Sequence, residues 1–322
     1  MVPQKHDGRF QIGRLSSFPA PKYIFLSSLG PALEYQTIIS VSELQNLLKS
    51  HSSKVVIFDC SFDLANPALG LTQFQESRIA GSLYASLDTD LSSHNPKDAV
   101  NGGRHPLPSR EIFANWLSKM GVTHESQVIV YDRQGVNFCG RLWWMLKWCG
   151  HSSVAILDGG LKAWTQAGGE TESGEQKQLI GNEAKTFKLN TPLVQMLSIG
   201  DLKTELNGQS PPTLVDARGT PRFKGEVEPL DPIAGHIPGA LNRPFNNNLN
   251  ADGFFKSKEE LRREFDALLS SRNPSHVVHQ CGSGVSAVPN LVAMVIAGFG
   301  YTTLYPGSWS EWSREPNPPV ER

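Results

Sequence analysis

An internal repeat limits the possible folds of this chain more than any other feature. One apolar segment ends in Asp132 and is followed by a glycine-containing turn and a Leu- and Trp-rich stretch that ends at Gly150. The same order recurs at 276–281, where the apolar segment ends in Cys281 and the next apolar stretch ends at Gly298. Cys281 lies 149 residues after Asp132, and a unit of this length is a whole domain. The 322 residues therefore predict two domains of one fold.

Each copy alternates short apolar runs with stretches of helical pattern. Runs that are apolar throughout are typical of parallel sheets covered by helices on both faces. Ser109 and Ser257 are expected helix N-caps, before helices over 110–120 and 258–269. We therefore predict an α/β fold with two domains, each a parallel sheet flanked by helices. The expected strands are 55–59, 128–132, 154–157, 213–216, 276–281 and 302–305.

Composition sets the domain boundaries. Residues 168–189 are mostly Gly, Glu, Gln, Lys and other polar residues, which is typical of an exposed linker. We place the first domain at 37–167 and the second at 190–315. Residues 1–36 are expected to be a poorly ordered extension, with a weak organelle-targeting segment as the alternative. Residues 316–322 contain three prolines and are expected to be a loose tail.

Charge and cysteine content exclude several classes of protein. The chain has 30 basic and 31 acidic side chains, so no basic field points to nucleic acid or an anionic membrane. Its longest apolar run is nine residues, against the ~18 needed to span a bilayer. Four scattered cysteines without a CxxC pair predict neither a disulfide framework nor a thiolate zinc site. We expect a cytoplasmic monomer.

Cys281 is the candidate nucleophile. It ends a strand of the buried type and is followed by Gly282, Ser283 and Gly284 before an apolar helix that begins near Ser286. Two glycines allow successive backbone N–H groups to turn inward and form an anion-binding nest. The helix N-terminus adds unpaired N–H donors, and both effects favour the thiolate, which is the nucleophilic form of cysteine.

Other interpretations of Cys281 fit less well. A cysteine that only caps a buried strand would explain neither the glycine pair nor the Asp132 at the matching position of the first copy. A cysteine phosphatase needs an arginine where Ala287 stands. A metal site with His276 and His279 is disfavoured because side chains three apart on a strand point to opposite faces. A loop of small residues suits a cysteine that carries a second, anionic sulfur as a persulfide.

Several motifs together resemble the rhodanese/sulfurtransferase superfamily in its tandem two-domain form, over about 280 residues. In that family the second domain bears the catalytic cysteine and the first is degenerate, which matches Cys281 and Asp132. The loop is similar to the signature of the 3-mercaptopyruvate sulfurtransferases, with Ser286 where Thr is usual. The motifs are 281–287 (CGSGVSA), 215–218 (VDAR), 235–240 (GHIPGA) and 307–312 (GSWSEW).

The resemblance implies roles for individual residues. Cys281 would carry the persulfide, and Ser283 would assist at the departing pyruvate. Arg222 would bind the donor anion. The persulfide would be cradled by the loop residues Gly282, Ser283, Gly284, Val285 and Ser286.

The sequence also departs from this pattern. The mercaptopyruvate enzymes have a second substrate arginine where Leu230 stands. They also have a first-domain histidine that works with the loop serine and an aspartate, and we match that histidine to Arg78 and place the aspartate near Leu69. Arg78 could supply positive charge to the substrate but cannot act as a base. On this alignment the Ser-His-Asp arrangement does not carry over.

We therefore predict a sulfurtransferase that needs no metal or cofactor. The expected donor is 3-mercaptopyruvate, or else thiosulfate, and the expected acceptor is a thiol or a thioredoxin-like protein. Two alternatives remain: thiosulfate:cyanide sulfur transfer as the main activity, or a non-catalytic module that relays persulfide from a partner.

Overall fold

The structure is a computed structural model that describes residues 34–176 and 186–322. Most of the expected extension at 1–36 and the middle of the expected linker at 168–189 lie outside the described residues. Glu34–Arg322 form one compact unit, in which the two halves of the repeat are in contact. Within the described ranges, no helix combines the length and apolar character needed to cross a bilayer.

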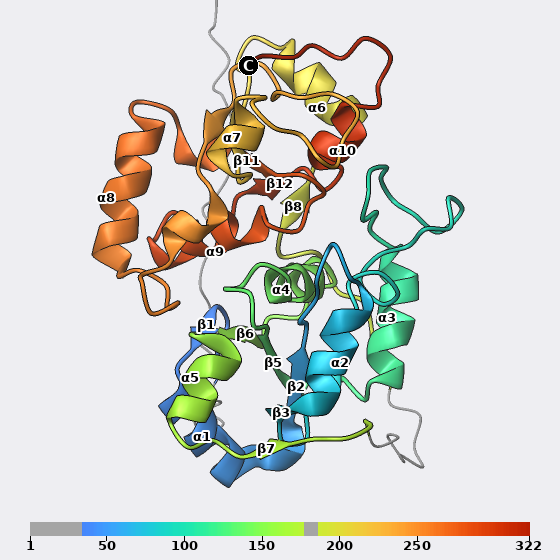
Figure 1. Ribbon diagram of the computed structural model, residues 1–322, viewed down its shortest axis with the longest axis vertical. Helices are drawn as coiled ribbons and strands as arrows, with labels where there is room; N and C mark the ends of the chain where they lie inside the picture. Colours follow the sequence, from blue (N-terminus) through green and yellow to red (C-terminus); the bar gives the residue numbers. More distant parts are fainter. Residues whose placement is uncertain (1–33, 177–185) are drawn as a thin grey trace, which may run out of the picture. The chain divides into compact units, whose positions relative to one another are not determined.

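The first half is built on a five-stranded parallel sheet with the order β1-β6-β5-β2-β4 (Figure 1). A short antiparallel pair, β3 with β7, lies beside it. The strands are β1 (Ile38–Ile39), β2 (Val55–Asp59), β3 (Arg78–Ile79), β4 (Leu83–Tyr84), β5 (Gln127–Tyr131), β6 (Val154–Leu157) and β7 (Thr171–Glu172). The helices are α1 (Val41–His51), α2 (Ala68–Glu76), α3 (Arg110–Lys119), α4 (Cys139–Trp148) and α5 (Gly160–Gln166), with a 3-10 turn at Ser52–Lys54.

The second half repeats this plan with the strand order β10-β9-β11-β12-β8, again all parallel. The strands are β8 (Gln195–Met196), β9 (Thr213–Asp216), β10 (Leu241–Asn242), β11 (Val277–Gln280) and β12 (Thr303–Leu304). The helices are α6 (Ile199–Leu206), α7 (Thr220–Phe223), α8 (Lys258–Leu269), α9 (Val288–Ile296) and α10 (Ser308–Trp312), with 3-10 turns at Phe245–Asn248 and Pro274–His276.

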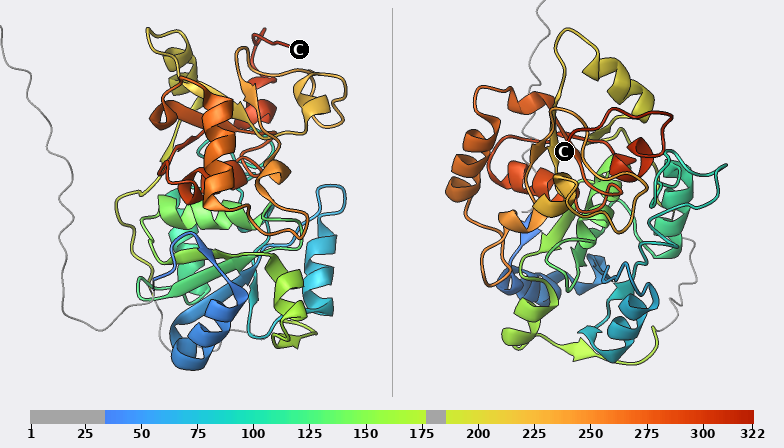
Figure 2. Two further views of the ribbon diagram at one scale, coloured as in Figure 1. Left: turned by 90° about the vertical axis from the view of Figure 1, so that its left-hand side faces the viewer. Right: turned by 45° about the horizontal axis from the view of Figure 1, so that its top comes forward.

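Both sheets are covered on two faces, as their apolar strands predict. In the first half α1 and α5 pack on one face, and α3 and α4 pack on the other. In the second half α6 and α10 share one face, while α8 and α9 share the other (Figures 1 and 2). The predicted α/β fold with two flanked parallel sheets is confirmed.

Asp132 and Cys281 occupy equivalent positions in the two sheets. Asp132 directly follows β5 and Cys281 directly follows β11, and each of these strands is the middle one of its sheet. In open parallel sheets ligands bind beyond the carboxyl ends of the strands. The repeat therefore places two equivalent turns at the edge where a parallel sheet presents its sites.

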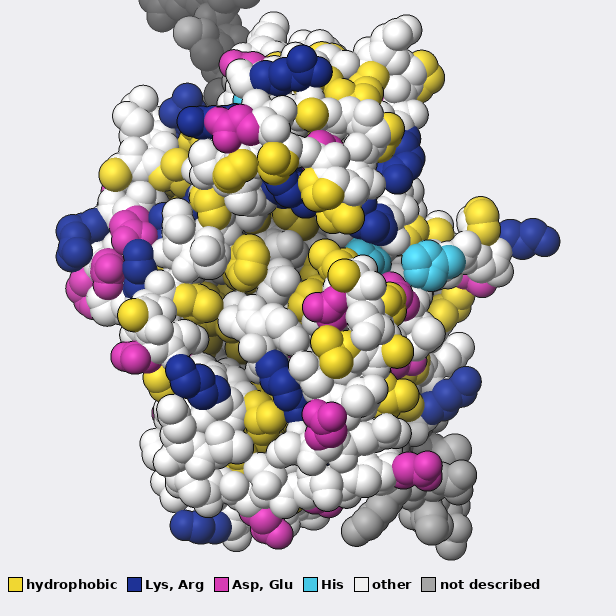
Figure 3. All heavy atoms as spheres, viewed as in Figure 1, with side chains coloured by type: hydrophobic (Ala, Val, Ile, Leu, Met, Phe, Trp, Pro, Cys, Tyr) yellow, Lys and Arg dark blue, Asp and Glu magenta, His cyan; other side chains and the backbone are white. Residues whose placement is uncertain are grey.

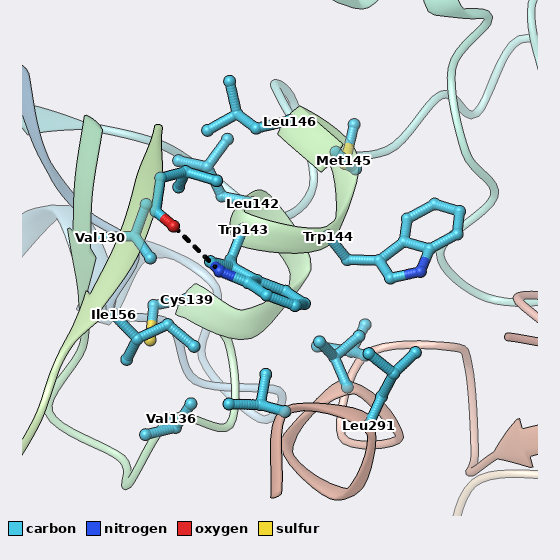
Figure 4. Packing of buried hydrophobic residues seen from close by; sticks show 14 of the residues in the cluster. Val130, Val136, Cys139, Leu142, Trp143, Trp144, Met145, Leu146, Ile156 and Leu291 are labelled. Carbon is cyan, nitrogen blue, oxygen red and sulfur yellow. Dashed lines mark hydrogen bonds between the residues drawn. The ribbon is translucent and has the colours of Figure 1, made fainter. Parts of the chain in front are cut away.

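The two halves share one hydrophobic core through α4 and α9. Every residue of α4 is buried, which is typical of a helix enclosed by protein on all sides. Trp143 donates its Nε1–H to the Val154 carbonyl at 3.1 Å, so that its polar atom is satisfied (Figure 4). Gly140 brings the helices together, since a Cβ there would lie 3.3 Å from Val288. Leu291 of α9 packs against the same cluster (Figure 4).

The two predicted N-caps are present. The Ser109 hydroxyl accepts a hydrogen bond from Ile112 N at 3.3 Å, and that of Ser257 accepts one from Glu260 N at 3.2 Å. On the surface, Figure 3 shows acidic and basic side chains mixed over the drawn face, without a continuous field of one sign. This distribution agrees with the balanced charge of the chain.

Two expected boundaries differ from the structure. The start of the expected linker is part of the first domain, because β7 pairs with β3 and the buried Arg78 bonds the carbonyls of Gly174 and Glu175. The expected loose tail is bound to the second domain. Glu321 and His236 exchange two backbone hydrogen bonds of 2.8 and 3.0 Å.

Removing residues 320–322 tests whether this tail is structural. The deletion loses both backbone bonds of Glu321 and the bond from Gly239 N to its carboxylate at 2.8 Å. We expect the free energy of unfolding to fall by about 1–2 kcal/mol in chemical denaturation. Glu321→Gln, which keeps the backbone pairing, should cost less. A deletion as stable as the full chain would show that the tail contributes nothing.

Candidate active site

Hydrogen bonds to α10 hold the turn that contains Cys281. Cys281 N–H donates to the Ser308 hydroxyl at 3.1 Å, and the Cys281 carbonyl accepts from Trp309 N at 3.0 Å. The next carbonyl, of Gly282, accepts from Ser310 N at 2.8 Å. The turn is therefore fixed on one side by its strand, β11, and on the other by a helix.

Glycine is required at position 284. Gly284 has φ of +73°, and a Cβ there would lie 2.2 Å from the Pro306 carbonyl oxygen. The matching glycine of the first domain, Gly135, has φ of +70°. The two turns thus share the left-handed residue that directs the following amides inward.

In the first domain the carboxylate of Asp132 fills its own turn. Its Oδ1 accepts hydrogen bonds from Gln134 N and Val136 N, both at 3.0 Å. Its Oδ2 accepts from Phe138 N at 2.8 Å and Cys139 N at 2.9 Å. Burial raises the pKa of Asp132, while these four amide bonds oppose the rise. The turn is therefore an anion site that a side chain of the same turn occupies.

The repeat relates these amides to those around Cys281. Counting 149 residues onward, the four donors correspond to Ser283, Val285, Ala287 and Val288. Val288 N donates instead to the Val285 carbonyl at 3.1 Å. The amides of Ser283, Val285 and Ala287 are then the counterparts of three donors to Asp132.

A histidine of the first domain contacts the serine of the turn. His105 Nδ1 lies 2.8 Å from the Ser283 hydroxyl, and His105 Nε2 lies 3.6 Å from Asp88 Oδ1. Our alignment, which left no histidine for this place, is wrong. Arg78 is 1% exposed and bonds Glu172 through Nε at 3.0 Å, so its guanidinium belongs to the β3–β7 edge of the first domain. Nothing in its contacts brings Arg78 to Ser283.

His105 is neutral at ordinary pH. Burial, reinforced by the charges of Arg141 and Arg104, lowers the pKa of His105 to about 3. Asp88 Oδ1, 3.6 Å from Nε2, is beyond hydrogen-bond distance, and its charge favours the proton on that nitrogen without offsetting the burial. With the proton on Nε2, Nδ1 accepts the hydrogen bond from the Ser283 hydroxyl.

Two arginines lie over Gly282. A Cβ on Gly282 would be 3.1 Å from Arg104 Nη2 and 3.5 Å from Arg222 Nη1. Arg222 of α7 was expected near the turn, whereas Arg104, from the first domain, was not. Leu230, which stands where a second arginine was sought, is exposed, and its neighbour Asp231 has a fully buried carboxylate that pairs with Arg104 at 2.8 Å.

Arg141 of α4 contacts the turn that contains Cys281 through its guanidinium group. Its Nη1 donates to the Gly284 carbonyl at 3.0 Å, and its Nη2 donates to the carbonyls of His105 at 3.0 Å and Leu91 at 3.3 Å. Burial lowers the pKa of Arg141 to about 9, and the nearby Cys281 acts in the opposite direction. A buried cation that bonds three backbone carbonyls at this place fixes the turn.

The other three cysteines lie outside this environment. Burial raises the pKa of Cys60 and Cys139 well above the ordinary value, and the charge of nearby Asp132 adds to the rise. Burial raises the pKa of Cys149 to about 12. Cys281 is itself 1% exposed, and the partly exposed Arg104 and Arg222 beside Gly282 mark the side on which solvent approaches the turn.

The histidines near Cys281 in sequence are separated in space. His276 is exposed in a 3-10 turn, while His279 is buried with its Nε2 3.3 Å from Met294 sulfur. In the described part of the chain, no three His, Cys, Asp or Glu side chains are grouped to hold a metal.

The residues that sequence analysis missed lie in the first domain. Asp88, Arg104 and His105 fall in the loop between β4 and α3, and Arg141 falls in the helix whose stretch was described as Leu- and Trp-rich. A signal was present in the run Gly102-Gly103-Arg104-His105, because two glycines followed by an arginine and a histidine in a loop are typical of a binding or catalytic segment.

The architecture and the turn define a rhodanese-type protein. The family model described as a rhodanese-like domain matches the chain twice, at 40–167 and 198–315. The chain belongs to this family.

The names of similar proteins indicate the kind of activity. A Pseudomonas aeruginosa protein with the provisional name 3-mercaptopyruvate sulfurtransferase is 42% identical over 83% of this chain and 92% of its own length. The human 3-mercaptopyruvate sulfurtransferase is 33% identical over 76% of this chain and 80% of its own. The structure of 3-mercaptopyruvate sulfurtransferase from Leishmania major matches with a TM-score of 0.70 at 30% identity, covering 86% of this chain and 74% of that one. The chain is a sulfurtransferase.

The protonation state of His105 can be measured directly. We expect its imidazole nitrogen shifts to report the neutral Nε2–H form unchanged from about pH 8 to pH 5, because burial disfavours the cation. Nitrogen-15 NMR on labelled protein, with His105→Gln to assign the signals, makes the measurement. A titration with a midpoint between about 6 and 7 would contradict the buried, neutral state.

Arg141 can be tested by its effect on the stability of the turn. Arg141→Met leaves the Gly284 and His105 carbonyls unpaired, and we expect the free energy of unfolding to fall by about 2–5 kcal/mol in chemical denaturation. Arg141→Lys, which keeps a donor and the charge, should lose less stability than Met does. A Met variant as stable as the unchanged chain would show that Arg141 does not fix the turn.

Proposed function

We propose that the chain transfers a sulfur atom from 3-mercaptopyruvate to a thiol acceptor through a persulfide on Cys281. The Cys281 thiolate attacks the donor sulfur, and the carbon–sulfur bond breaks. The electron pair passes to the departing carbon, which takes the proton of the donor thiol and becomes the methyl group of pyruvate. Cys281 retains the sulfur as an anionic persulfide. The step needs neither metal nor cofactor, because the thiolate supplies the electron pair.

The carboxylate of Asp132 is the observation that carries this proposal. Its oxygens are two bonds from Cβ, as the outer sulfur of a cysteine persulfide would be. Four amides of the first-domain turn converge on those oxygens. In the second domain the corresponding amides of Ser283, Val285 and Ala287 would therefore face the outer sulfur of Cys281. They would stabilise its charge before and after transfer, without reorganisation.

The contact between His105 and Ser283 supports mercaptopyruvate as the donor. A neutral imidazole that accepts from the Ser283 hydroxyl aligns that hydroxyl and increases its polarity. As pyruvate departs, the Ser283 hydroxyl can rotate and move its single proton from His105 Nδ1 to a hydrogen bond with the enolate oxygen. The side chains at 282 and 283 are small and uncharged, so the turn itself adds no cation for the sulfite end of thiosulfate.

Thiosulfate is the second candidate donor, because two guanidinium groups lie over Gly282. In that reaction the sulfur–sulfur bond of the donor breaks and sulfite leaves with the electron pair. A Mycobacterium tuberculosis protein with the provisional name thiosulfate sulfurtransferase SseB is 38% identical over 89% of this chain and 97% of its own length. Its name supports the same alternative.

The proposal also includes the sulfur acceptor, the cellular location and the oligomeric state of the protein. A small thiol or a thioredoxin-like protein would remove the outer sulfur and restore the Cys281 thiolate. Four free cysteines suit a reducing cytoplasm, where we place the protein. One chain supplies every residue named for the reaction, so we propose that a monomer is active.

The proposal is tested by comparing the two donors on one preparation. We expect mercaptopyruvate to add the mass of one sulfur atom to the intact protein and to support thiocyanate formation with cyanide. Cys281→Ser should abolish the added mass and lower turnover at least about a thousandfold, because no other residue replaces the nucleophile. Cys149→Ala is the matched control and should keep both activities.

The rates with the two donors distinguish the two candidate reactions from a non-catalytic relay module. Faster turnover with thiosulfate than with mercaptopyruvate would favour the second candidate donor. Turnover with neither donor above the level of Cys281→Ser would overturn the enzyme proposal and favour a relay module.

A further inference from the structure

We propose that Ser308, the first residue of α10, is a positioning residue whose hydroxyl fixes the backbone of Cys281 and so directs the nucleophilic sulfur. The inference rests on the proposed function and adds to it a residue that acts through the main chain. It also accounts for a serine in a backbone conformation that side chains rarely adopt.

The backbone of Ser308 is strained. Its φ is +55°, in the left-handed region that glycine enters freely and that other residues enter at a cost. Trp312 lies 148 residues after Trp164, and at that offset Ser308 corresponds to Gly160 of the first domain. Gly160 has nearly the same φ, +57°. The second domain therefore has a strained serine where the fold accepts glycine, and such strain is typical of positions with a function.

The first domain has no room for this side chain. A Cβ on Gly160 would lie 2.5 Å from the carbonyl oxygen of Asp132, the residue that matches Cys281. In the second domain the side chain of Ser308 is present and fully buried, and it contacts the backbone of Cys281. The two domains thus differ both at the nucleophile and at the position that holds its backbone.

The Ser308 hydroxyl connects Cys281 to its own strand. The hydroxyl donates its single proton to the Tyr305 carbonyl at 2.9 Å, so its oxygen accepts from Cys281 N–H at 3.1 Å. Tyr305 N donates in turn to the carbonyl of His279, two residues before Cys281, at 2.9 Å. These three bonds close a ring between the end of β11 and the start of α10, and the ring fixes the direction of the Cys281 N–H.

Both peptide groups that flank the Cα of Cys281 are held. The preceding group donates its N–H to Ser308, and its carbonyl, from Gln280, accepts from Ala217 N at 2.9 Å. The following group accepts from Trp309 N at 3.0 Å. Ala217 and Trp309 use main-chain atoms, whereas Ser308 uses its side chain. Of these three bonds, the one to Ser308 can be removed by a substitution that leaves the main chain intact.

Loss of this bond should affect sulfur transfer more than donor binding. The two peptide groups set the direction of the Cys281 Cα–Cβ bond, and the sulfur must meet both the donor and the amides of the turn. A displacement of about 1 Å costs roughly 100-fold in rate where reacting groups must be aligned. The Ser308 hydroxyl bonds main-chain atoms of the protein, so its removal takes no ligand from the donor.

Steady-state kinetics of two variants tests the role. We expect Ser308→Ala and Ser308→Gly each to lower kcat with mercaptopyruvate about 10- to 100-fold, with KM changed less than about threefold. Both remove the hydroxyl, but Ala keeps the strained backbone and Gly relieves it. Ser308→Gly should therefore have the higher melting temperature of the two while its kcat is equally low. A residue that only stabilised the fold would not separate stability from rate in this way.

Two matched controls use the same substitutions elsewhere. Ser270→Gly changes another serine of positive φ, +54°, whose side chain is exposed at the end of α8. Ser313→Ala removes a buried hydroxyl at the other end of α10 that bonds nothing within the part of the chain that the structure describes. Each control should keep kcat and KM within about twofold of the unchanged chain.

Hydrogen exchange reports the bond without any donor. By NMR, the Cys281 amide should exchange at least about tenfold faster in Ser308→Gly than in the unchanged chain, because its acceptor is removed. An unchanged exchange rate would overturn the inference. So would an unchanged kcat in both Ser308 variants, or a kcat that falls only in Ser308→Ala, together with stability. Failure of the unchanged chain with both donors would instead overturn the proposed function, and the exchange rates would still show whether Ser308 fixes the Cys281 backbone.

Discussion

The structure depends on an amide-lined turn at the carboxyl end of the middle strand of a parallel sheet. The fold makes this turn twice, with a glycine of positive φ at the same step, Gly135 and Gly284. In the first domain the carboxylate of Asp132 accepts four of its amides. Such a turn stabilises an anion two bonds beyond Cβ. Cys281 at the matching position therefore lies where the persulfide we propose would be stabilised.

The first domain has Asp132 at the position that matches the cysteine, and it contributes residues to the site of the second domain. Arg141 crosses from α4 to the Gly284 carbonyl, and His105 contacts Ser283. Arg104 lies beside Gly282. The buried α4 is the element that joins these contributions, because it shares one hydrophobic cluster with α9.

The sequence predicted the fold well and the site in part. Apolar runs and N-cap serines depend on local patterns, so β2, β9, α3 and α8 were expected at or within a residue of their observed bounds. Cys281 was found because its turn is also local. His105 and Arg104 were missed because their partners are 178 and 127 residues away, and periodicity carries no information about such pairs. Arg78 was misassigned because the sequence does not show which groups its guanidinium bonds. In the structure these groups are Glu172 and the carbonyls of Gly174 and Glu175.

The most direct measurement is a crystal structure of the protein after treatment with mercaptopyruvate. We expect electron density for one additional sulfur on Cys281, within hydrogen-bonding distance of the amides of Ser283, Val285 and Ala287. Its position should superimpose on the Asp132 carboxylate oxygens when the two domains are overlaid. An added sulfur that points away from these amides, or a turn that rearranges to expose the thiol to solvent without contacting them, would contradict the claim that the amides hold the anion.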